Sequence, residues 1–410
     1  MNEQNGVINL VNYQIFRSPQ LIVYARDAME RVGTETALRG QTALIVSDEI
    51  MRGLGNVDRC VDLLSKEGVQ SEIYTGVASE PTDTYVDEAL ALYRSGHCDI
   101  VISLGGGSCI DTAKAVAVLA TNDGYIGDYM GGKKVAAQAP VPHIAIPTTA
   151  GTGSEATDVT IITNTTDDVK MMIKQPAFMP TVAIVDPVLS MSSPKKVTAA
   201  TGVDALSHAV EAYLSKKAHA MTDTLALEAI RLIVPNLRRV YADPDDVAAR
   251  EAMSTGSLYG GMAFTNASVC LVHGMSRPIG ALFHVPHGVS NAMLLPAVLE
   301  FSKGDCIERL ATIGRIFSEE ANEMTDEAAA DFAVAEVKKL CMDLEIPNLR
   351  GWGIDPVEFE GAIDKMAKDA IISGSPNNNP CVPSHEEIME LYQLCFNYDF
   401  AATETSGNIS

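Results

Sequence analysis

The chain has 410 residues, of which 47% are hydrophobic, and its formal net charge is -23 at pH 7. The length exceeds the usual size of a single hydrophobic core, so two domains are expected, and the acidity argues against nucleic-acid binding, which needs a basic face. Eight cysteines without CxxC pairs, no signal-peptide pattern at the start and no run long enough for a membrane span predict a cytoplasmic protein that contacts no membrane.

The first part of the chain alternates short apolar runs of strand length with helix-like stretches. After an extended start around residues 8–16, strands are expected at 43–46, 71–74, 100–103, 143–146 and 182–185. Amphipathic stretches such as 82–95 lie between several of them, as parallel βαβ units require. This pattern predicts an α/β domain with a parallel sheet and flanking helices.

The early strand at 43–46 is followed by an acidic residue, Asp48. Dinucleotide-binding folds commonly hold a carboxylate at this place for the ribose hydroxyls. A carboxylate here favours NAD, because it would repel the 2′-phosphate of NADP. The alternative is an ordinary turn in which Asp48 caps the following helix.

A glycine-rich turn follows the strand expected at 100–103. Gly105, Gly106, Gly107 and Ser108 open a helix, so backbone amides and the helix N-terminus can point at a pyrophosphate. The alternative is that these glycines have a purely steric role. The turn is neither a GxGxxG nor a Walker sequence, which counts against an NTPase.

A second loop, at residues 147–155, follows the strand expected at 143–146 and offers hydroxyls and two glycines. Such a loop can wrap a cofactor, and it can equally be ordinary turn chemistry. Its place after a strand of the same expected sheet favours the first interpretation.

The composition changes at residues 186–194. Long stretches rich in Ala, Leu, Met and Glu follow, for example 222–234, 247–258 and 326–344, and these predict helices. We therefore expect an α/β domain at residues 1–192 and an all-helical domain at residues 193–410. The small polar tail at 401–410 is expected to be loose.

Four potential metal ligands lie in the second part. Asp204 and His208 are four residues apart in a helical segment, 201–214, which places both on one face. His273 and His287 follow in an apolar stretch where an unpaired buried imidazole would be costly. A carboxylate with three imidazoles suits Fe(II) or Zn(II). Taken alone, the Asp204–His208 pair also fits a solvated pair or a local hydrogen bond.

These blocks, in this order, resemble the iron-containing (group III) alcohol dehydrogenase family over nearly the whole chain. The matching blocks are 105–114, 147–155, 202–213 and 273–291. The resemblance implies a dinucleotide-binding domain, an all-helical domain, a divalent metal in the cleft between them, and a homodimer or larger homo-oligomer. It also implies an NAD(H)-dependent alcohol dehydrogenase or aldehyde reductase, in which the metal acts as a Lewis acid and hydride passes between substrate and nicotinamide.

The resemblance further assigns individual residues. It implies that the metal ligands are Asp204, His208, His273 and His287. In the cofactor site, beside Asp48, it implies Gly105, Gly106, Gly107, Ser108, Asp111, Thr148, Thr149 and Lys170, and Lys114 matches the same first block. Phe264 resembles a substrate-side aromatic position, although the chemistry of the residue by itself favours core packing.

One position departs from the family pattern. Many relatives carry a histidine four residues after the third ligand, where this chain has Arg277. A guanidinium stays protonated and cannot act as a base at neutral pH. His284, three residues before His287, is an alternative proton relay, and a structural histidine is the competing interpretation.

Arg277 also bears on the substrate. A guanidinium near the metal can hold a carboxylate, phosphonate or sulfonate, which favours a short acid-bearing aldehyde such as sulfoacetaldehyde, phosphonoacetaldehyde or succinic semialdehyde. The alternative is that Arg277 pairs with a neighbouring carboxylate or with the cofactor phosphates.

Other functions on this scaffold are a neutral alcohol or diol dehydrogenase of the lactaldehyde, propanediol or glycerol type, and a dehydroquinate-synthase-like lyase that cycles its NAD internally. A non-catalytic NAD- and metal-binding sensor is a more distant alternative. Net NADH turnover separates the dehydrogenases from the lyase, and absence of turnover on a broad aldehyde panel would favour the sensor.

Overall fold

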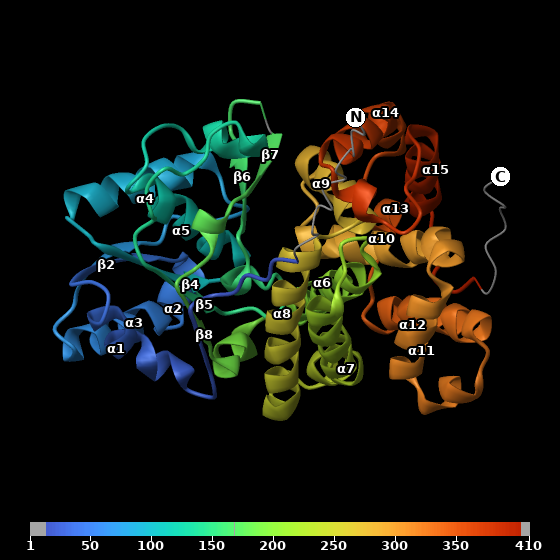
Figure 1. Cartoon of the computed structure of the whole chain (residues 1–410), viewed down its shortest axis with the longest axis horizontal. Coiled ribbons are helices and arrows are strands. Elements are labelled where there is room, and N and C mark those ends of the chain that lie inside the picture. Colours follow the sequence, from blue (N-terminus) through green and yellow to red (C-terminus); the bar gives the residue numbers. More distant parts are fainter. Residues whose placement is uncertain (1–13, 168, 403–410) are drawn as a thin grey trace, which may run out of the picture.

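The computed structural model of the protein describes residues 14–167 and 169–402. Most of the segments at 8–16 and 401–410, for which sequence expectations were given, lies outside these residues. An α/β half contains the first part of the chain and a helical half contains the rest (Figure 1). In the described ranges, none of the helices is both long enough and apolar enough to cross a membrane.

A six-stranded parallel sheet forms the centre of the α/β half. Its strand order is β1-β8-β5-β4-β2-β3. The strands are β1 (Leu21–Tyr24), β2 (Thr42–Val46), β3 (Gln70–Tyr74), β4 (Ile100–Gly105), β5 (His143–Pro147) and β8 (Val182–Val185). β4, β5 and β8 are buried along their whole length, as expected for parallel strands covered on both faces. All five strands expected from the sequence are confirmed.

Side chains of each central strand alternate between two cores, one on each face of the sheet. In β2, Leu44 and Val46 pack in one core together with residues of α4 (Asp83–Ser95) and α5 (Gly107–Leu119). Ala43 and Ile45 pack in the other. That second core is covered by α1 (Val32–Ala37), α2 (Glu49–Gly53) and α3 (Asn56–Lys66). The sheet is therefore a rigid layer between helices, with its carboxyl edge left for binding.

An antiparallel hairpin stands apart from this sheet. It consists of β6 (Val159–Asn164) and β7 (Val169–Lys174). Met171 and Ile173 are buried against the α4–α5 core, so the alternate residues of β7, Lys170 among them, face the other way. Neither β1 nor this hairpin was predicted from the sequence.

The helical half begins after the short 3-10 turn at Pro187–Ser192. Its long helices are α6 (Lys195–Leu214), α7 (Ala220–Ala242), α8 (Val247–Ala267), α9 (Leu271–Phe283), α10 (His287–Ser302), α11 (Ile307–Phe317), α12 (Asp326–Asp343), α14 (Pro356–Ile372) and α15 (His385–Phe396), with the short α13 (Leu349–Trp352). All the expected helical stretches are confirmed. α6 is buried almost throughout from Thr198 to Leu214, so it is the central helix of this half. The division at residues 192 and 193 stays a prediction, although β8 ends at Val185 and α6 begins at Lys195.

The two halves meet where α8 approaches the loop after β5. Gly153 has a φ of +60°, and a Cβ added at Gly261 of α8 would lie 2.6 Å from its carbonyl oxygen. Nearby, the Thr265 hydroxyl donates to Asp158 Oδ1 over 2.8 Å and accepts from the Asp158 backbone N–H over 3.1 Å. Two glycines in backbone contact thus fix the loop at 147–155 against the helical half.

Substitution of Gly261 by Ala is expected to lower the free energy of unfolding by about 1–3 kcal/mol, because the new methyl group collides with backbone atoms that cannot rotate away. Urea unfolding followed by circular dichroism measures the change. Gly361 in α14 is the matched control, since a Cβ there meets no atom within 4 Å, and Gly361→Ala should stabilise the exposed helix by roughly 0.5–1 kcal/mol. Equal effects of the two substitutions would contradict the packing described.

Candidate metal centre and active site

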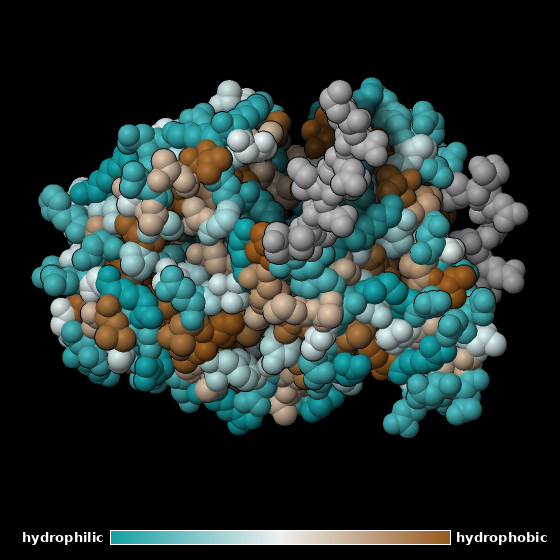
Figure 2. Space-filling view, in the orientation of Figure 1, coloured by the Kyte–Doolittle hydropathy of each residue, from teal (hydrophilic) through white to brown (hydrophobic). Residues whose placement is uncertain are grey.

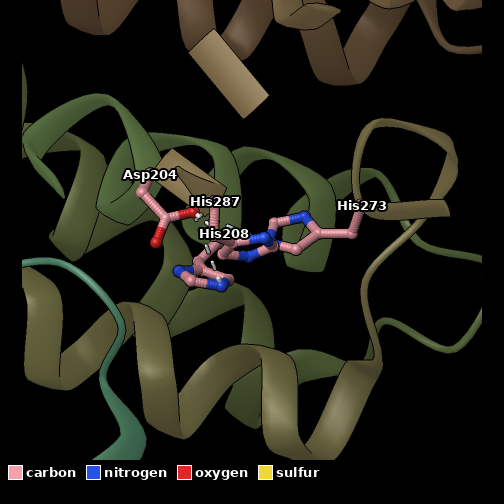
Figure 3. A group of neighbouring side chains, drawn as sticks. All are labelled: Asp204, His208, His273 and His287. Atoms are coloured by element: carbon pink, nitrogen blue, oxygen red, sulfur yellow. Dashed lines mark ion pairs between the residues drawn. The ribbon is translucent and has the colours of Figure 1, made fainter. Parts of the chain in front are cut away.

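Three helices bring four potential metal ligands together. α6 supplies Asp204 and His208, α9 supplies His273, and His287 begins α10 (Figure 3). One ligand atom of each residue lies within 4.8 Å of the others. Asp204 Oδ1 is 4.0 Å, 3.7 Å and 3.8 Å from Nε2 of His208, His273 and His287 respectively. The cluster that the sequence predicted is therefore assembled around one point.

The electrostatics of the cluster fit a divalent cation. Asp204, His208 and His273 are each less than 5% exposed. Burial lowers the pKa of His208 to about 4 and that of His287 to about 3, so both imidazoles keep free lone pairs at pH 7. A carboxylate buried beside neutral imidazoles needs a positive partner, and one oxygen with three nitrogen donors matches Fe(II) or Zn(II).

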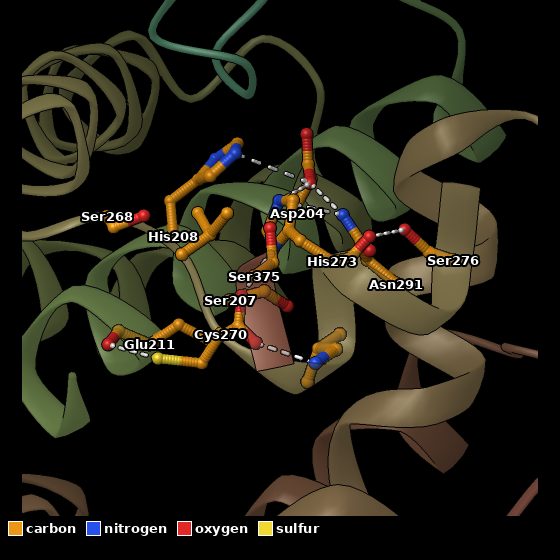
Figure 4. A network of polar contacts seen from close by, with 12 residues as sticks. Asp204, Ser207, His208, Glu211, Ser268, Cys270, His273, Ser276, Asn291 and Ser375 are labelled. Atoms are coloured by element: carbon orange, nitrogen blue, oxygen red, sulfur yellow. Dashed lines mark hydrogen bonds and ion pairs between the residues drawn. The ribbon is translucent and has the colours of Figure 1, made fainter. Parts of the chain in front are cut away.

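A further carboxylate, Glu211, supports the cluster from behind. It lies on α6, one turn beyond His208, and its Oε2 contacts Nδ1 of His273 while Oε1 accepts a 2.7 Å hydrogen bond from the Val272 backbone N–H (Figure 4). Burial raises the pKa of Glu211 to about 7 and lowers the pKa of His273. A carboxylate on Nδ1 fixes the tautomer that leaves Nε2 free for a metal.

Glu211 was not among the residues predicted from the sequence, although the matching block at 202–213 contains it. A usable signal was present: Glu211 is seven residues after Asp204, two turns along the same face of α6. The contact of Glu211 with His273 could not be inferred from the sequence, because the two residues are 62 positions apart.

A cavity of about 390 Å³ connects the metal cluster to the start of α5. Its volume is in the usual range for small-molecule sites. Figure 2 shows this face of the molecule hollowed between the β6–β7 hairpin and the helices α9 and α14. Among the sequence-predicted residues the wall contains Gly107, Ser108, Asp111, Lys170, His208, Phe264, His273, Arg277 and His287. The cavity thus joins the predicted cofactor loop to the predicted metal ligands.

The glycine turn and the second loop lie against each other. β4 ends at Gly105 and α5 begins at Gly107, with Gly106 between them in extended conformation. A Cβ on Gly107 would lie 2.8 Å from the Thr152 side chain, so position 107 favours glycine, whereas a Cβ on Gly106 would meet no atom closer than 3.7 Å. Beside the turn are Thr148, whose N–H donates to the Gly105 carbonyl oxygen over 3.0 Å, and Thr149.

The position of Asp48 is compatible with both predicted roles, which are capping of a helix and binding of the ribose hydroxyls. Its Oδ1 caps α2 by accepting a 2.8 Å hydrogen bond from the Met51 N–H. Its Oδ2 would lie 3.4 Å from a Cβ on Gly105, which places the carboxylate next to the glycine turn. Capping is therefore observed, and the role towards a ribose stays a prediction.

Asp111 and Lys114 are engaged by the protein itself. Asp111 accepts hydrogen bonds from the Ser154 hydroxyl, over 2.5 Å, and from the Ile161 N–H, over 2.9 Å. Lys114 is buried and donates to Ser154, Thr157 and the Val159 carbonyl oxygen. Both residues hold α5 to β6 and to the segment before it. Lys170 is different, because its ammonium lies in the cavity wall, 3.1 Å from Glu80.

The three residues predicted on the substrate side have different environments. Phe264 stacks on His208 with ring centroids 4.3 Å apart and lines the cavity. His284 is exposed, ends α9 in a left-handed conformation and does not belong to the cavity wall. Its position therefore gives no support to a proton relay.

Arg277 lies one turn beyond His273 on α9 and reaches the cavity. One Nη1 hydrogen bond goes to the Ser375 hydroxyl, over 3.0 Å, and the buried Nε has no hydrogen-bond partner in the part of the chain that the structure describes. Burial lowers the pKa of Arg277 to about 10, so the guanidinium is still charged at pH 7. Within residues 14–167 and 169–402 no carboxylate forms an ion pair with it.

Comparison with known proteins agrees with this geometry. The family model for iron-containing alcohol dehydrogenase matches residues 19–187, and the model for the C-terminal part of the same family matches residues 198–396. The chain is a member of the iron-containing alcohol dehydrogenase family. This dehydrogenase is 38% identical to 1,3-propanediol dehydrogenase of Klebsiella pneumoniae over 92% of its own length and 97% of that protein.

Solved structures show the same relationship. The structure of a 1,3-propanediol oxidoreductase has a TM-score of 0.90 and 37% identity, covering 94% of this dehydrogenase and all of that chain. The structure of sulfoacetaldehyde reductase from Bifidobacterium kashiwanohense in complex with NAD+ has a TM-score of 0.84 and 29% identity, covering 95% of this chain and 100% of that one. The predicted family, fold and enzyme class are confirmed, so the sensor and lyase alternatives are set aside. The family indicates a divalent metal together with NAD(H), and the Asp and His cluster fits the metal.

Replacement of Glu211 by Ala is expected to weaken Fe(II) and Zn(II) binding by roughly 10- to 100-fold, because His273 loses the group that fixes its tautomer and orientation. Competition with a chromophoric chelator measures the two dissociation constants. Ser207→Ala is the matched control on the same helix, since that buried hydroxyl donates to the Val203 carbonyl oxygen of its own helix. Unchanged metal affinity in the Glu211 variant would show that the contact is structural only.

Proposed function

We propose that this dehydrogenase reduces a short aldehyde that carries an acid group, with NADH as hydride donor. The proposal rests on the charge, position and hydrogen bonds of the Arg277 guanidinium. Its charged guanidinium reaches the cavity beside the metal cluster. Among the described residues its Nε has no acceptor, and its one observed hydrogen bond goes to a neutral hydroxyl. A partly buried cation of this kind is complementary to a carboxylate, phosphonate or sulfonate.

The charge of the cavity supports the same substrate class. Lys170, Lys174 and Lys217 line its wall together with Arg277, although the chain as a whole carries a formal charge of -23. A local excess of positive charge in an acidic protein concentrates anions at that place. The nicotinamide cofactor, which carries phosphates, benefits from the same field.

In this proposal each group in the cavity has a definite task. Asp204, His208, His273 and His287 would hold the metal, and the amides at the start of α5, Gly107 and Ser108 among them, would hold the cofactor pyrophosphate. A bound metal supplies Lewis acidity towards the carbonyl oxygen and the nicotinamide supplies hydride.

The chain's own residues then fix the substrate. Phe264, stacked on His208, covers one side of the metal cluster with an apolar ring and keeps water from it. Arg277, one helical turn from His273, would bind the acid group, and this spacing along one helix limits the substrate to a short molecule.

The acid-bearing class is also represented among similar structures, since the sulfoacetaldehyde reductase from Bifidobacterium kashiwanohense shares the fold at 29% identity. The second candidate is a neutral diol or alcohol substrate. It is favoured by the higher identity, 38%, to 1,3-propanediol dehydrogenase of Klebsiella pneumoniae. Only the acid-bearing candidate provides an anionic group on the substrate for Arg277 to bind.

Replacement of Arg277 by Ala is expected to lower kcat/KM for acid-bearing aldehydes by about 10- to 150-fold, which corresponds to about 1.5–3 kcal/mol for hydrogen bonds to a charged group, and to change kcat/KM for neutral aldehydes little. The measurement is NADH oxidation by metal-replete protein against sulfoacetaldehyde, phosphonoacetaldehyde, succinic semialdehyde, lactaldehyde and 3-hydroxypropionaldehyde. Lys196→Ala removes the same charge at an exposed position outside the cavity and is the control.

Equal losses on acid-bearing and neutral aldehydes would contradict the anion-binding role of Arg277. A wild-type enzyme that prefers the neutral aldehydes would instead support the diol candidate. Arg277→Lys separates the two contributions of the side chain, because lysine keeps the charge and loses the paired, planar donors.

A further inference from the structure

The short 3-10 turn η8 (Ser375–Asn378) forms part of the cavity wall. It packs closely against α9, since a Cβ added at Gly274 would lie 2.9 Å from the Pro376 ring. Residues three positions apart eclipse each other in a 3-10 turn. The side chains of Ser375 and Asn378 therefore project on the same side, and both residues are buried and border the cavity.

Two serine hydroxyls in the wall are held by this arrangement. Arg277 Nη1 donates to Ser375 Oγ over 3.0 Å, and Asn378 Nδ2 donates to Ser268 Oγ over 3.0 Å. Each oxygen thus accepts a hydrogen bond, and within the described ranges neither hydroxyl donates one to a protein atom. Because a hydroxyl carries one hydrogen that rotates to suit its acceptor, both hydrogens are free for a ligand in the cavity.

The backbone of Ser268 is in an unusual conformation. Ser268 follows the end of α8 with a φ of +70° and a ψ of 164°, a region almost confined to glycine. Its N–H donates to the Phe264 carbonyl oxygen over 2.7 Å, and Asn378 Nδ2 also donates to the Val269 carbonyl oxygen over 3.1 Å. Strain that the surrounding structure enforces is concentrated at ligand-binding positions, so the conformation of Ser268 points to a role in the cavity.

Positive charge lies in the same part of the wall. Arg277 is partly buried there, and among the described residues its Nε has no acceptor. Lys217 is exposed and also borders the cavity, and the N–H of its neighbour Lys216 donates to the Asn378 carbonyl oxygen over 2.8 Å. A free guanidinium N–H and two free hydroxyl hydrogens beside positive charge favour an anion.

We propose that Arg277, Ser375 and Ser268 form an oxoanion subsite, which binds a sulfonate or phosphonate group and discriminates against a carboxylate. The three donors come from three segments, which are α9, η8 and the end of α8. A sulfonate or phosphonate has three oxygens around one axis, whereas the two oxygens of a carboxylate accept hydrogen bonds near one plane. A carboxylate would leave one donor without an acceptor, which weakens binding. The inference rests on the proposed function, because it narrows the class of acid-bearing substrates.

Three alcohols that differ only in their acid group test the oxoanion subsite. They are isethionate, 2-hydroxyethylphosphonate and 3-hydroxypropionate, which share a hydroxyethyl group. With Fe(II)-loaded protein and NAD+, kcat/KM for the better of the first two is expected to exceed that for 3-hydroxypropionate by at least about 10-fold. The ratio between the first two identifies the preferred oxoanion. A preference for 3-hydroxypropionate, or equal values for all three, overturns the inference.

The neutral diol 1,3-propanediol separates this inference from the proposed function. If 3-hydroxypropionate is preferred to both oxoanions and to 1,3-propanediol, the oxoanion subsite is refuted and an acid-bearing substrate is still supported. If 1,3-propanediol is preferred to all three acids, both are refuted.

Two substitutions remove one hydroxyl each. Ser375→Ala and Ser268→Gly are each expected to lower kcat/KM for the preferred oxoanion by about 10-fold and to change it little for 3-hydroxypropionate. Glycine suits the backbone at position 268 better than serine does, so the second variant adds no strain. Ser373→Ala is the matched control, because that hydroxyl borders the same cavity but donates to the Ala370 carbonyl oxygen over 2.6 Å. Equal losses on all substrates overturn the inference.

Binding of unreactive analogues provides a readout without turnover or mutation. Calorimetric titration of the wild-type protein, loaded with Fe(II) and NAD+, gives dissociation constants for ethanesulfonate, ethylphosphonate and propionate. One of the two oxoanions is expected to bind at least about 10-fold more tightly than propionate. Equal or tighter binding of propionate overturns the inference even if the variants do not fold.

Discussion

The buried carboxylate of Asp204 faces three neutral imidazoles, and much of the helical half serves to keep that arrangement in place. Asp204 lies on α6, which is buried almost along its entire length, so its position is fixed by packing on all sides. Glu211 extends this control to α9 through its contacts with Val272 and His273. Three helices must hold their mutual positions for the four lone pairs to meet, because no ligand lies on a flexible loop.

The α/β half contributes a different kind of surface. Its glycine turn exposes backbone amides at the start of α5, and the β6–β7 hairpin presents Lys170, Met172 and Lys174 along one side of the cavity. The helical half offers side chains with lone pairs and a charged guanidinium. Neither surface is sufficient for a hydride transfer, which needs a cofactor and a substrate held together, and the cavity lies where they meet.

The sequence predicted those parts that depend on residues close together in the chain. Continuous Ile and Val runs revealed the central strands, and the spacing of Asp204 and His208 revealed one face of α6. The strand β7 escaped prediction because its three successive apolar residues, Met171 to Ile173, stand between two lysines without a clear alternation, which is a weaker signal. Contacts across long separations escaped too, such as Glu211 with His273 and Asn291 with Asp204, 62 and 87 residues apart. His284 is exposed because it ends α9 in a left-handed conformation, and the periodicity of the sequence does not predict this conformation.

The backbone contact between Gly153 and Gly261 limits how the protein can be re-engineered. Many enzymes are altered by exchanging a cofactor loop between homologues while the rest is kept. Here the loop at 147–155 touches α8 without an intervening side chain, so no rotamer can absorb a small shift of the loop. A chimaera that takes this loop from another dehydrogenase should therefore also take α8, and the two segments are best regarded as one exchangeable unit.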